Sequence, residues 1–514
     1  MNNNALSRTD LDEAACGRLA QRIALKLKPG DAIALHGDLG AGKTTFARAL
    51  IRALLGDAEA EVPSPTFALM QLYDTPRLQL AHLDLYRLAD ESEVDELGIA
   101  DLLDSGAIIV EWPERAPSVL PPNRLDITLS QGAGTDTRTI SIAPSGSWAS
   151  RLHRLDEMTA FVGFDARWAH AETRYLQGDA SARAYARLHA AGGERAVLMD
   201  SPRLPDGPPI RDGLPYSRIA HLAEDVAPFV AVAGALSAAG LSVPQIHHAD
   251  LDRGFLLLED FGDRVFGREL ESGTGQAELW KTATDALAVL HRGPSPKAIP
   301  LTNGTVYTVP QQDRGALAIE VELLPDWYWP ALFGEPIPPE IRAEFLTIWN
   351  GLFDKLLALP TGWVLRDFHS PNLMWLPERQ GARRVGIIDF QDALVGPPAY
   401  DLVSLLQDAR LDVPADLEAV MFAHYCEAAM MDQPRFDHAA FQFAYSALGA
   451  QRNTKILGIF ARLARRDGKP GYLRHVPRLW RYLERDLAHP ELSSLRAWFD
   501  RHLGPELRAR PIEA

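Results

Sequence analysis

A glycine-rich motif near the start of the chain limits the folds that this sequence can adopt. The eight residues Gly37-Asp-Leu-Gly-Ala-Gly-Lys-Thr44 match the pattern G-x-x-x-x-G-K-[ST] of phosphate-binding loops. The apolar segment 31–36 before the motif predicts a buried strand, and residues 43–55 predict a helix. A strand, this loop and a helix in that order indicate an α/β domain of the P-loop NTPase class.

Each part of the loop has a predicted role in binding ATP and Mg²⁺. The glycines let backbone N–H groups face the phosphates, Lys43 reaches the outer phosphates, and Thr44 is a ligand for Mg²⁺. Two predicted strands end in the acids Asp84 and Glu111, and beside a phosphate-binding loop we expect both to hold Mg²⁺ directly or through water. The predicted nucleotide contacts are Gly37, Asp38, Gly40, Ala41, Gly42, Lys43, Thr44 and Thr45.

Two further segments belong to this first domain. Residues 10–27 have the apolar spacing of an amphipathic helix, with Leu11 on its apolar side. The stiff loop Pro63-Ser-Pro-Thr-Phe67 carries two hydroxyl groups, and we expect it to sense the γ-phosphate.

A second motif, in the C-terminal half, predicts phosphoryl transfer to a hydroxyl group. Asp367 and Asn372 have the D-x-x-x-x-N spacing of the kinase catalytic loop, and Asp389 follows an apolar run. Such transfer needs a carboxylate to accept the hydroxyl proton, and an amide with a second carboxylate to hold the magnesium ions. Asp367 is therefore the predicted catalytic residue, and Asn372 and Asp389 are the predicted metal ligands.

The residues before this second motif predict a lobe that binds ATP. Residues 174–187 have the pattern strand, turn, strand, with Gly178 and Ser181 in a turn suited to lie over phosphates. Glu259 and Phe261 end a predicted strand at a hinge, where we expect them to contact the adenine.

One position in this lobe departs from the kinase pattern. Kinases usually carry a phosphate-binding lysine in the strand that corresponds to residues 195–200, and this chain has Met199 there. Arg183 or Arg187 is a hypothetical substitute. Mainly helical sequence follows, with helices predicted at 278–291, 339–358, 400–410, 416–430 and 441–463.

Composition limits the classes of function. The 514 residues indicate two or three domains, and a net charge of −16 argues against a general nucleic-acid binder. No apolar run is long enough to span a bilayer, so no membrane partner is expected. The start Met1–Ala5 lacks the features of a signal peptide, and only Cys16 and Cys426 are present, which predicts a cytoplasmic protein.

A turn-rich segment, residues 143–150, is the best candidate for a domain boundary. We expect a P-loop domain at 1–148, a linker at 149–158 and a kinase domain at 159–505.

Several blocks of the first domain resemble the bacterial TsaE family. This resemblance implies an ATPase subunit of the machinery that makes threonylcarbamoyladenosine in tRNA, with Lys43, Thr44, Asp84 and Glu111 serving ATP and Mg²⁺. It also implies docking on a TsaB–TsaD-type protein pair, so that tRNA is contacted only indirectly. The blocks are Gly37–Thr45, Ser64–Phe67, His82–Arg87, Glu96–Gly98 and Glu111–Glu114.

The second half resembles the aminoglycoside phosphotransferase-like kinases, through Arg366–Asn372, Ile388–Asp392 and Gly396–Leu406. Within that superfamily it is most similar to the AmgK amino-sugar kinases, which phosphorylate the anomeric hydroxyl of N-acetylmuramate and N-acetylglucosamine in cell-wall recycling. The resemblance implies a bilobal α+β protein-kinase-like domain. Blocks similar to AmgK are Gln177–Ser181, Val197–Asp200, Glu322–Tyr328 and Gln451–Leu463.

Four residues are candidate contacts for the sugar. Glu322, Asp326 and Trp327 combine carboxylates with an indole that suits a sugar ring, although a helix cap with a buried aromatic fits them equally. Arg452, with Lys455 and Arg462, is a candidate for the lactyl carboxylate of muramate, and a solvated helix face is the alternative.

Other functions remain open at this point. A kinase of the same fold can act on an aminoglycoside, choline or homoserine. The second half can also be an inactive kinase in a nucleotide-binding complex subunit, which the intact Asp367, Asn372 and Asp389 disfavour. A protein kinase lacks support, because the glycine-rich loop and the lysine are missing.

Overall fold

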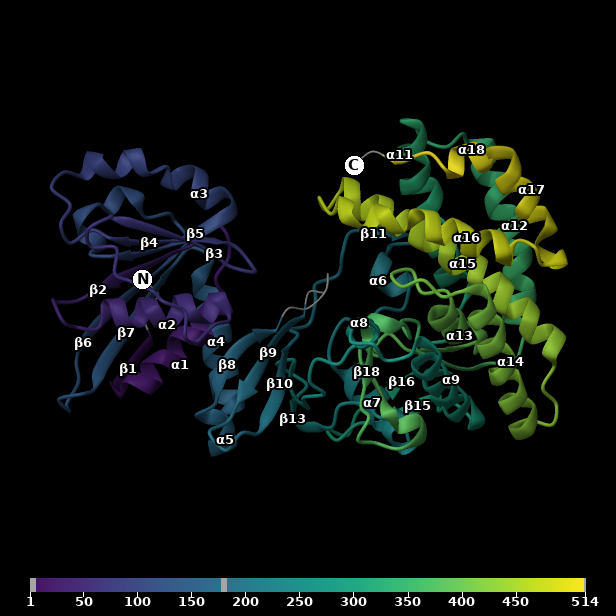
Figure 1. The fold of residues 1–514 in the computed structure, drawn as a ribbon, viewed down its shortest axis with the longest axis horizontal. Coiled ribbons are helices and arrows are strands. Elements are labelled where there is room, and N and C mark those ends of the chain that lie inside the picture. The colour runs from purple at the N-terminus through teal and green to yellow at the C-terminus, as the bar shows by residue number, and fades with distance from the viewer. Residues whose placement is uncertain (1–5, 177–182, 513–514) are drawn as a thin grey trace. The chain divides into compact units, whose positions relative to one another are not determined.

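The computed structural model describes residues 6–176 and 183–512, which form two compact units (Figure 1). The first unit comprises the chain up to Pro202 together with His247–Asp260. The second comprises Arg203–Ile246 and the chain from Phe261 onward. The first unit therefore extends past residue 148 and also contains the beginning of the second half of the chain.

A seven-stranded mixed sheet among the described residues organises the P-loop domain, in the order β1-β7-β6-β2-β5-β4-β3. Its centre is parallel, and the β6–β7 hairpin and the edge strands β1 and β3 are antiparallel. The strands are β1 (Leu6–Leu11), β2 (Ala32–His36), β3 (Met70–Asp74), β4 (Gln79–Asp84), β5 (Gly106–Glu111), β6 (Arg124–Gln131) and β7 (Arg138–Ser145). The helices are α1 (Glu13–Ala24), α2 (Lys43–Leu55) and α3 (Ile99–Ser105).

The register of this sheet places the two predicted metal-binding acids side by side. Asp84 pairs with Glu111 across β4 and β5, and Leu35 at the end of β2 pairs with Glu111 from the other side. Because the carboxyl ends of parallel strands meet at one edge, both acids lie at the edge where β2 leads into the phosphate-binding loop.

The predicted helix at 10–27 is wrong at its start. Leu11 ends strand β1, which pairs with β7. Asp12 caps α1, since its side chain accepts a hydrogen bond of 2.7 Å from the amide of Ala15. The apolar residues of a half-buried edge strand and of the adjoining helix produced one continuous pattern in the sequence.

A five-stranded antiparallel sheet also belongs to the first unit, in the order β13-β14-β10-β9-β8 among the described residues. Side chains alternate between its two faces. Leu198 and Asp200 lie on one face of β10, and Val197 and Met199 lie on the other. The strands are β8 (Glu172–Leu176), β9 (Ala184–His189), β10 (Arg195–Asp200), β13 (Ile246–Asp250) and β14 (Phe255–Glu259).

The segment 149–158, expected as a linker, lies inside the helix α4 (Trp148–Val162), which α5 (Ala166–Ala169) follows. The apolar face of α4 is buried, and Trp148 is fully enclosed. The small and polar residues at 143–150 that suggested a linker end β7, form the turn at 146–147 and begin α4. One hydrophobic core includes residues of α1, α2, the seven-stranded sheet, α4 and the five-stranded sheet: Ile23, Leu50, Ile127, Trp148, Leu155, Leu198 and Phe255.

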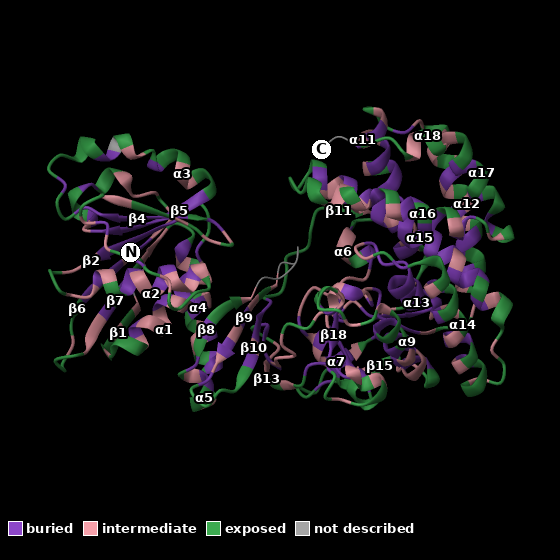
Figure 2. Ribbon diagram, in the orientation of Figure 1, coloured by how far each residue is buried: buried purple, intermediate pink, exposed green. Residues whose placement is uncertain are grey.

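The second unit is mainly helical, and many of its buried residues lie in α13 and α15 (Figure 2). The predicted helices near 278–291, 339–358, 400–410, 416–430 and 441–463 are confirmed. The helices are α6 (Tyr216–Ile219), α7 (Ala227–Ala238), α8 (Phe266–Glu271), α9 (Gln276–Arg292), α10 (Arg314–Val321), α11 (Trp329–Phe333), α12 (Pro339–Leu357), α13 (Ala399–Leu406), α14 (Ala415–Asp432), α15 (His438–Arg465), α16 (Val476–Asp486), α17 (Ser493–His502) and α18 (Pro505–Arg508). Short antiparallel pairs join β11 (Pro209–Arg211) to β12 (Leu214–Pro215), β15 (Ala298–Pro300) to β16 (Val306–Thr308), β17 (Gly362–Val364) to β20 (Leu394–Gly396), and β18 (Leu373–Trp375) to β19 (Val385–Ile387).

Candidate active sites

The phosphate-binding loop turns sharply between β2 and α2. Gly37, Gly40 and Gly42 all have positive φ, and a Cβ on Gly37 would lie 2.4 Å from the carbonyl oxygen of Leu129, so this position requires glycine. The Lys43 ammonium donates to the carbonyl oxygens of Gly37, at 2.6 Å, and of Asp38, at 3.0 Å. The lysine side chain therefore lies against the backbone of its own loop.

The two predicted metal-binding acids are fixed by hydroxyl groups. Thr44 donates to Glu111 over 2.8 Å, which joins the loop to the end of β5. Ser64 and Thr66 donate to one oxygen of Asp84 over 2.9 and 2.6 Å. The loop 63–67, expected to sense the γ-phosphate, thus orients a carboxylate in this structure.

His82 was missed by the sequence analysis. It is fully buried, and its Nε2 lies 2.9 Å from the second oxygen of Glu111. A polar residue two positions before the strand-end Asp84 was the available signal, because alternate residues of a strand share a face.

Hydroxyl and carboxylate oxygens are the ligands that Mg²⁺ prefers, and Mg²⁺ is usually bound by one or two carboxylates together with substrate phosphates and waters. Thr44, Asp84 and Glu111 line one cavity of about 370 Å³ and fit this requirement. The described residues contain no separate cluster of three or more His, Cys, Asp or Glu side chains suited to a metal. Gly42 and Thr45 also line a groove of about 720 Å³ along α1 and α2.

The three predicted catalytic-loop residues come together in the second unit. The hairpin β18–β19 connects them, since the amide of Ile388 donates to the carbonyl of Asn372 over 3.0 Å and Asp389 follows Ile388. The side-chain amide of Asn372 donates to the carbonyl oxygen of Asp367, also over 3.0 Å. Gln391 donates to one carboxylate oxygen of Asp389 over 2.8 Å.

Asp401 holds the backbone at the start of the catalytic loop. Its carboxylate accepts from the amides of Leu365, at 2.7 Å, and Arg366, at 2.9 Å, and Ser404 donates to the carbonyl of Arg366. Burial raises the pKa of Asp401 to about 7, although both amide hydrogen bonds oppose the rise. These contacts fix Arg366 with a positive φ of 70°, directly before Asp367.

Interactions with neighbouring side chains keep Asp367 ionised. Burial alone would raise its pKa, but the charges of His369, Lys455 and Arg366 outweigh burial, and the pKa of Asp367 lies below its usual value. The carboxylate is therefore ready to accept a proton at neutral pH.

Glu320 was also missed by the sequence analysis. It is 2% exposed and forms ion pairs with Arg366 and, at 2.7 Å, with Lys455, while Gln451 donates to its second oxygen. Burial would raise its pKa, but Lys455 and Arg366 lower the pKa of Glu320 to about 2. Lys455, expected near the sugar, is thus part of a buried ion cluster behind the catalytic loop.

Two protein-family models match separate parts of the chain. Residues 11–140 match the family model described as threonylcarbamoyl adenosine biosynthesis protein TsaE, and residues 172–439 match the phosphotransferase enzyme family. The chain is 42% identical to the N-acetylmuramate/N-acetylglucosamine kinase of Caulobacter vibrioides over 65% of this chain and 92% of that protein. It is 36% identical to the TsaE protein of Rickettsia felis over 29% of this chain and 86% of that protein.

The chain belongs to both families. It is a fusion of an N-terminal TsaE module with a C-terminal phosphotransferase module, as the sequence predicts. The predicted fold classes, a P-loop α/β domain and a protein-kinase-like domain, are confirmed as well. A second kinase relative, from Pseudomonas aeruginosa, is 36% identical over 63% of this chain and 87% of that protein.

The four residues predicted to contact ATP in the phosphotransferase module belong to different parts of the chain. Gly178 and Ser181 lie outside the described residues. Glu259 ends β14 in the first unit, and Phe261 begins the return of the chain to the second unit. Phe261 packs its ring against Gly386, where a Cβ would come within 2.8 Å of the ring.

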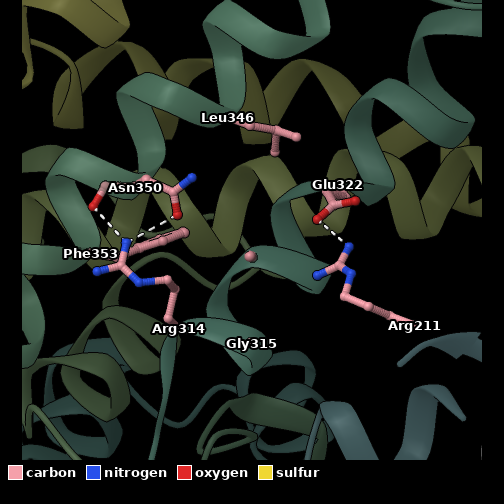
Figure 3. Close-up of a pocket in the computed structure, with 8 residues that line it drawn as sticks. Arg211, Arg314, Gly315, Glu322, Leu346, Asn350 and Phe353 are labelled. Carbon is pink, nitrogen blue, oxygen red and sulfur yellow. Dashed lines mark hydrogen bonds and ion pairs between the residues drawn. The ribbon is translucent and has the colours of Figure 1, made fainter. Parts of the chain in front are cut away.

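The candidate sugar contacts do not form one group. Glu322 and Asp326 share Arg342, at 2.8 and 2.5 Å, and Glu322 also binds Arg211. Figure 3 shows Glu322 on a pocket of about 330 Å³. Residues two positions apart on a helix point about 200° away from each other. Glu322 therefore faces away from the side on which Glu320 meets the catalytic loop.

The remaining two candidates lie apart from that pair. Trp327 is half-buried in a π-helical turn, Leu324–Tyr328. Arg452 is buried and donates to the carbonyl oxygen of Gln407 over 3.3 Å. Burial raises the pKa of Asp367, and the charge of Arg452 is one of those that lower this pKa. Of the four candidates, Arg452 is the one that the structure associates with the catalytic loop.

A basic pocket of about 350 Å³ adjoins the catalytic loop. Arg410, Lys469, Tyr472, Arg474 and His475 line it. Asp408 links the pocket to the loop, because its carboxylate accepts from the amides of both Ser370 and Arg410. Within the described part of the chain, neither Lys469 nor Arg474 forms an ion pair with a carboxylate.

No helix in the described ranges has the length and apolar character needed to cross a membrane.

Proposed function

We propose that the phosphotransferase module transfers the γ-phosphate of ATP to the anomeric hydroxyl of N-acetylmuramate or N-acetylglucosamine. The observation that carries this proposal is the 42% identity to a kinase of that name over 92% of its length. The convergence of Asp367, Asn372 and Asp389 on one hairpin supports it. Cell-wall sugar recycling in the cytoplasm is the proposed setting.

In the proposed reaction, Asp367 accepts the hydrogen bond of the anomeric hydroxyl and takes its proton as that oxygen attacks the γ-phosphorus. The bond between the γ-phosphorus and the β–γ bridging oxygen breaks, and ADP leaves. Asn372 and Asp389 would hold Mg²⁺, which neutralises the phosphate oxygens. Positioning and charge neutralisation supply most of the rate.

The basic pocket is proposed to receive the carboxylate of the acid sugar. A guanidinium or ammonium group without a carboxylate partner is suited to bind an anion, and two such groups, on Lys469 and Arg474, line this pocket. The neutral sugar lacks a carboxylate, so these residues distinguish the two substrates.

The TsaE module is proposed to hydrolyse ATP for a TsaB–TsaD-type complex that forms threonylcarbamoyladenosine in tRNA. Two large apolar side chains support protein docking, because Leu39 and Phe67 are 76% and 85% exposed and belong to the loops beside the nucleotide cavity. The net charge of −16 agrees with a protein partner that holds the tRNA.

A substrate panel tests the kinase proposal. The full-length protein is incubated with ATP, Mg²⁺ and either sugar, an aminoglycoside, choline or homoserine, and products are followed by phosphorus NMR. A sugar 1-phosphate is the expected product. Another phosphorylated acceptor would replace the substrate assignment, and phosphorylation of none of them would favour a nucleotide-binding subunit with an inactive kinase half.

A further inference from the structure

The five-stranded sheet of the phosphotransferase module has one face packed against the TsaE module. Residues on that face, including Leu188, Leu198 and Leu257, are almost fully buried in the core that contains Ile23 of α1 and Leu50 of α2. Strand β8 contacts both helices, and the side chain of Gln21 accepts from the amide of Thr173 over 2.9 Å. The two modules therefore share one interior within the first unit.

A buried ion cluster closes this interface. Asp200, at the end of β10, is 5% exposed. Arg154 of α4 donates to one of its oxygens from two nitrogens, at 2.9 and 2.7 Å, and Lys26, just after α1 of the TsaE module, binds the other oxygen. The side chain of Lys26 is 14% exposed, so water screens this contact little.

The ion cluster includes the end of β10, which corresponds to the strand that carries the phosphate-binding lysine in kinases. Asp200 follows Met199, which stands where kinases carry their lysine. Because neighbouring residues face opposite ways, Met199 lies on the other face of the sheet, together with Arg187, which forms an ion pair of 2.8 Å with Asp260. Contacts that restrain Asp200 therefore also restrain the strand that carries Met199 on its other face.

We propose that the TsaE module is a structural part of the phosphotransferase, with Lys26 as a positioning residue for β10. In this chain, unlike the kinase relatives that match only its C-terminal two thirds, ATP binding by the phosphotransferase depends on a residue of another module. In this chain, the five-stranded sheet is the partner that packs against α1 and α2.

Hydrogen exchange in the full-length protein tests the proposal without reference to the acceptor. Lys26→Met should speed exchange of β10 and β14 amides by about tenfold, because a buried carboxylate loses one partner. Lys26→Arg should restore slow exchange. Lys28→Met is the matched control, since Lys28 is an exposed lysine two residues away. Equal exchange in Lys26→Met and Lys28→Met would overturn the proposal.

Asp200→Asn gives the same test from the phosphotransferase side and covers the case in which Lys26→Met is poorly folded. If the two residues act on each other, Lys26→Met has no further effect on exchange in the Asp200→Asn background. Independent, additive effects would contradict a direct role for Lys26.

Steady-state kinetics separates positioning from general stability. With N-acetylglucosamine as acceptor, Lys26→Met should raise the KM for ATP several-fold and leave kcat unchanged, and Lys26→Arg should reverse the change. A fall in kcat alone would overturn the positioning role. If no sugar is phosphorylated by the unmodified protein, the acceptor assignment fails, and the exchange experiment still decides the role of Lys26.

Discussion

At the residue scale, Asp367 is the proposed general base for phosphoryl transfer. Asp367→Asn keeps the shape of the side chain and removes its ability to take a proton. We expect kcat to fall by about 10²–10⁴-fold, the usual contribution of a general base, with little change in ATP binding. Product formation by phosphorus NMR and ATP binding by calorimetry measure both effects.

A matched control lies on the same hairpin, because Glu378 is exposed and belongs to the segment that connects β18 to β19. Glu378→Gln should keep full activity. Unchanged kcat in Asp367→Asn would remove Asp367 from the mechanism.

The pKa of Glu320 predicts a pH-dependent contribution to stability. The pKa of Glu320 is about 2 in the folded protein, compared with 4.5 for a glutamate without these partners. The ionised carboxylate therefore stabilises the fold above about pH 4.5, and this stabilisation is lost as the pH falls toward 2. Glu320→Gln leaves Arg366 and Lys455 buried without their partner and should reduce the free energy of unfolding at pH 7 by about 3–5 kcal/mol.

Urea unfolding at pH 7 and pH 4 measures this change. The exposed Glu340 of α12 provides the control, and Glu340→Gln should unfold like the unmodified protein at both pH values. An equally small effect of Glu320→Gln would show that the ion cluster does not support the catalytic loop.

At the element scale, the turn after α15 is the proposed site of sugar selectivity. The double substitution of Arg474→Gln and Lys469→Gln should lower kcat/KM for N-acetylmuramate by about 10-fold or more. A hydrogen bond to a charged group contributes about 1.5–3 kcal/mol to binding. N-acetylglucosamine should react as before. Arg465→Gln, at the exposed end of α15, is the control.

Equal losses for both sugars would assign these two side chains to ATP binding or to folding. A loss confined to the acid sugar would place its carboxylate in the basic pocket.

The loop 63–67 offers a separate test in the TsaE module. Phe67→Ser should weaken binding to a TsaB–TsaD-type pair by at least about tenfold, because a large exposed apolar side chain is a typical interface anchor. ATP binding should not change, since Phe67 is 85% exposed. Leu72→Ser on β3, which is 44% exposed, is the control, and an equal effect of both variants would exclude a specific role for Phe67.

Local sequence patterns predicted most of the helices and strands around the candidate sites, and they missed interactions between distant parts of the chain. Asp84 and Glu111 were predicted as site residues because each ends an apolar strand, and Asp367 and Asn372 because of their spacing. Glu320 and His82 were missed, because their partners are distant in the sequence. The helix α4 was missed although its buried residues have helical spacing, because the turn-rich residues before it favoured a linker.

At the scale of the whole molecule, the shared core predicts that the TsaE module and the five-stranded sheet unfold together. In native-state hydrogen exchange with low urea, the slowest amides of β2 and β5 should report the same free energy of opening as those of β10 and β14, within about 1 kcal/mol. The strands β18 and β19 belong to the second unit and serve as the reference. Different opening energies for β5 and β10 in the unmodified protein would show two independent modules joined only by α4. Equal energies that separate in Lys26→Met would show that the buried ion cluster is what makes the first unit cooperative.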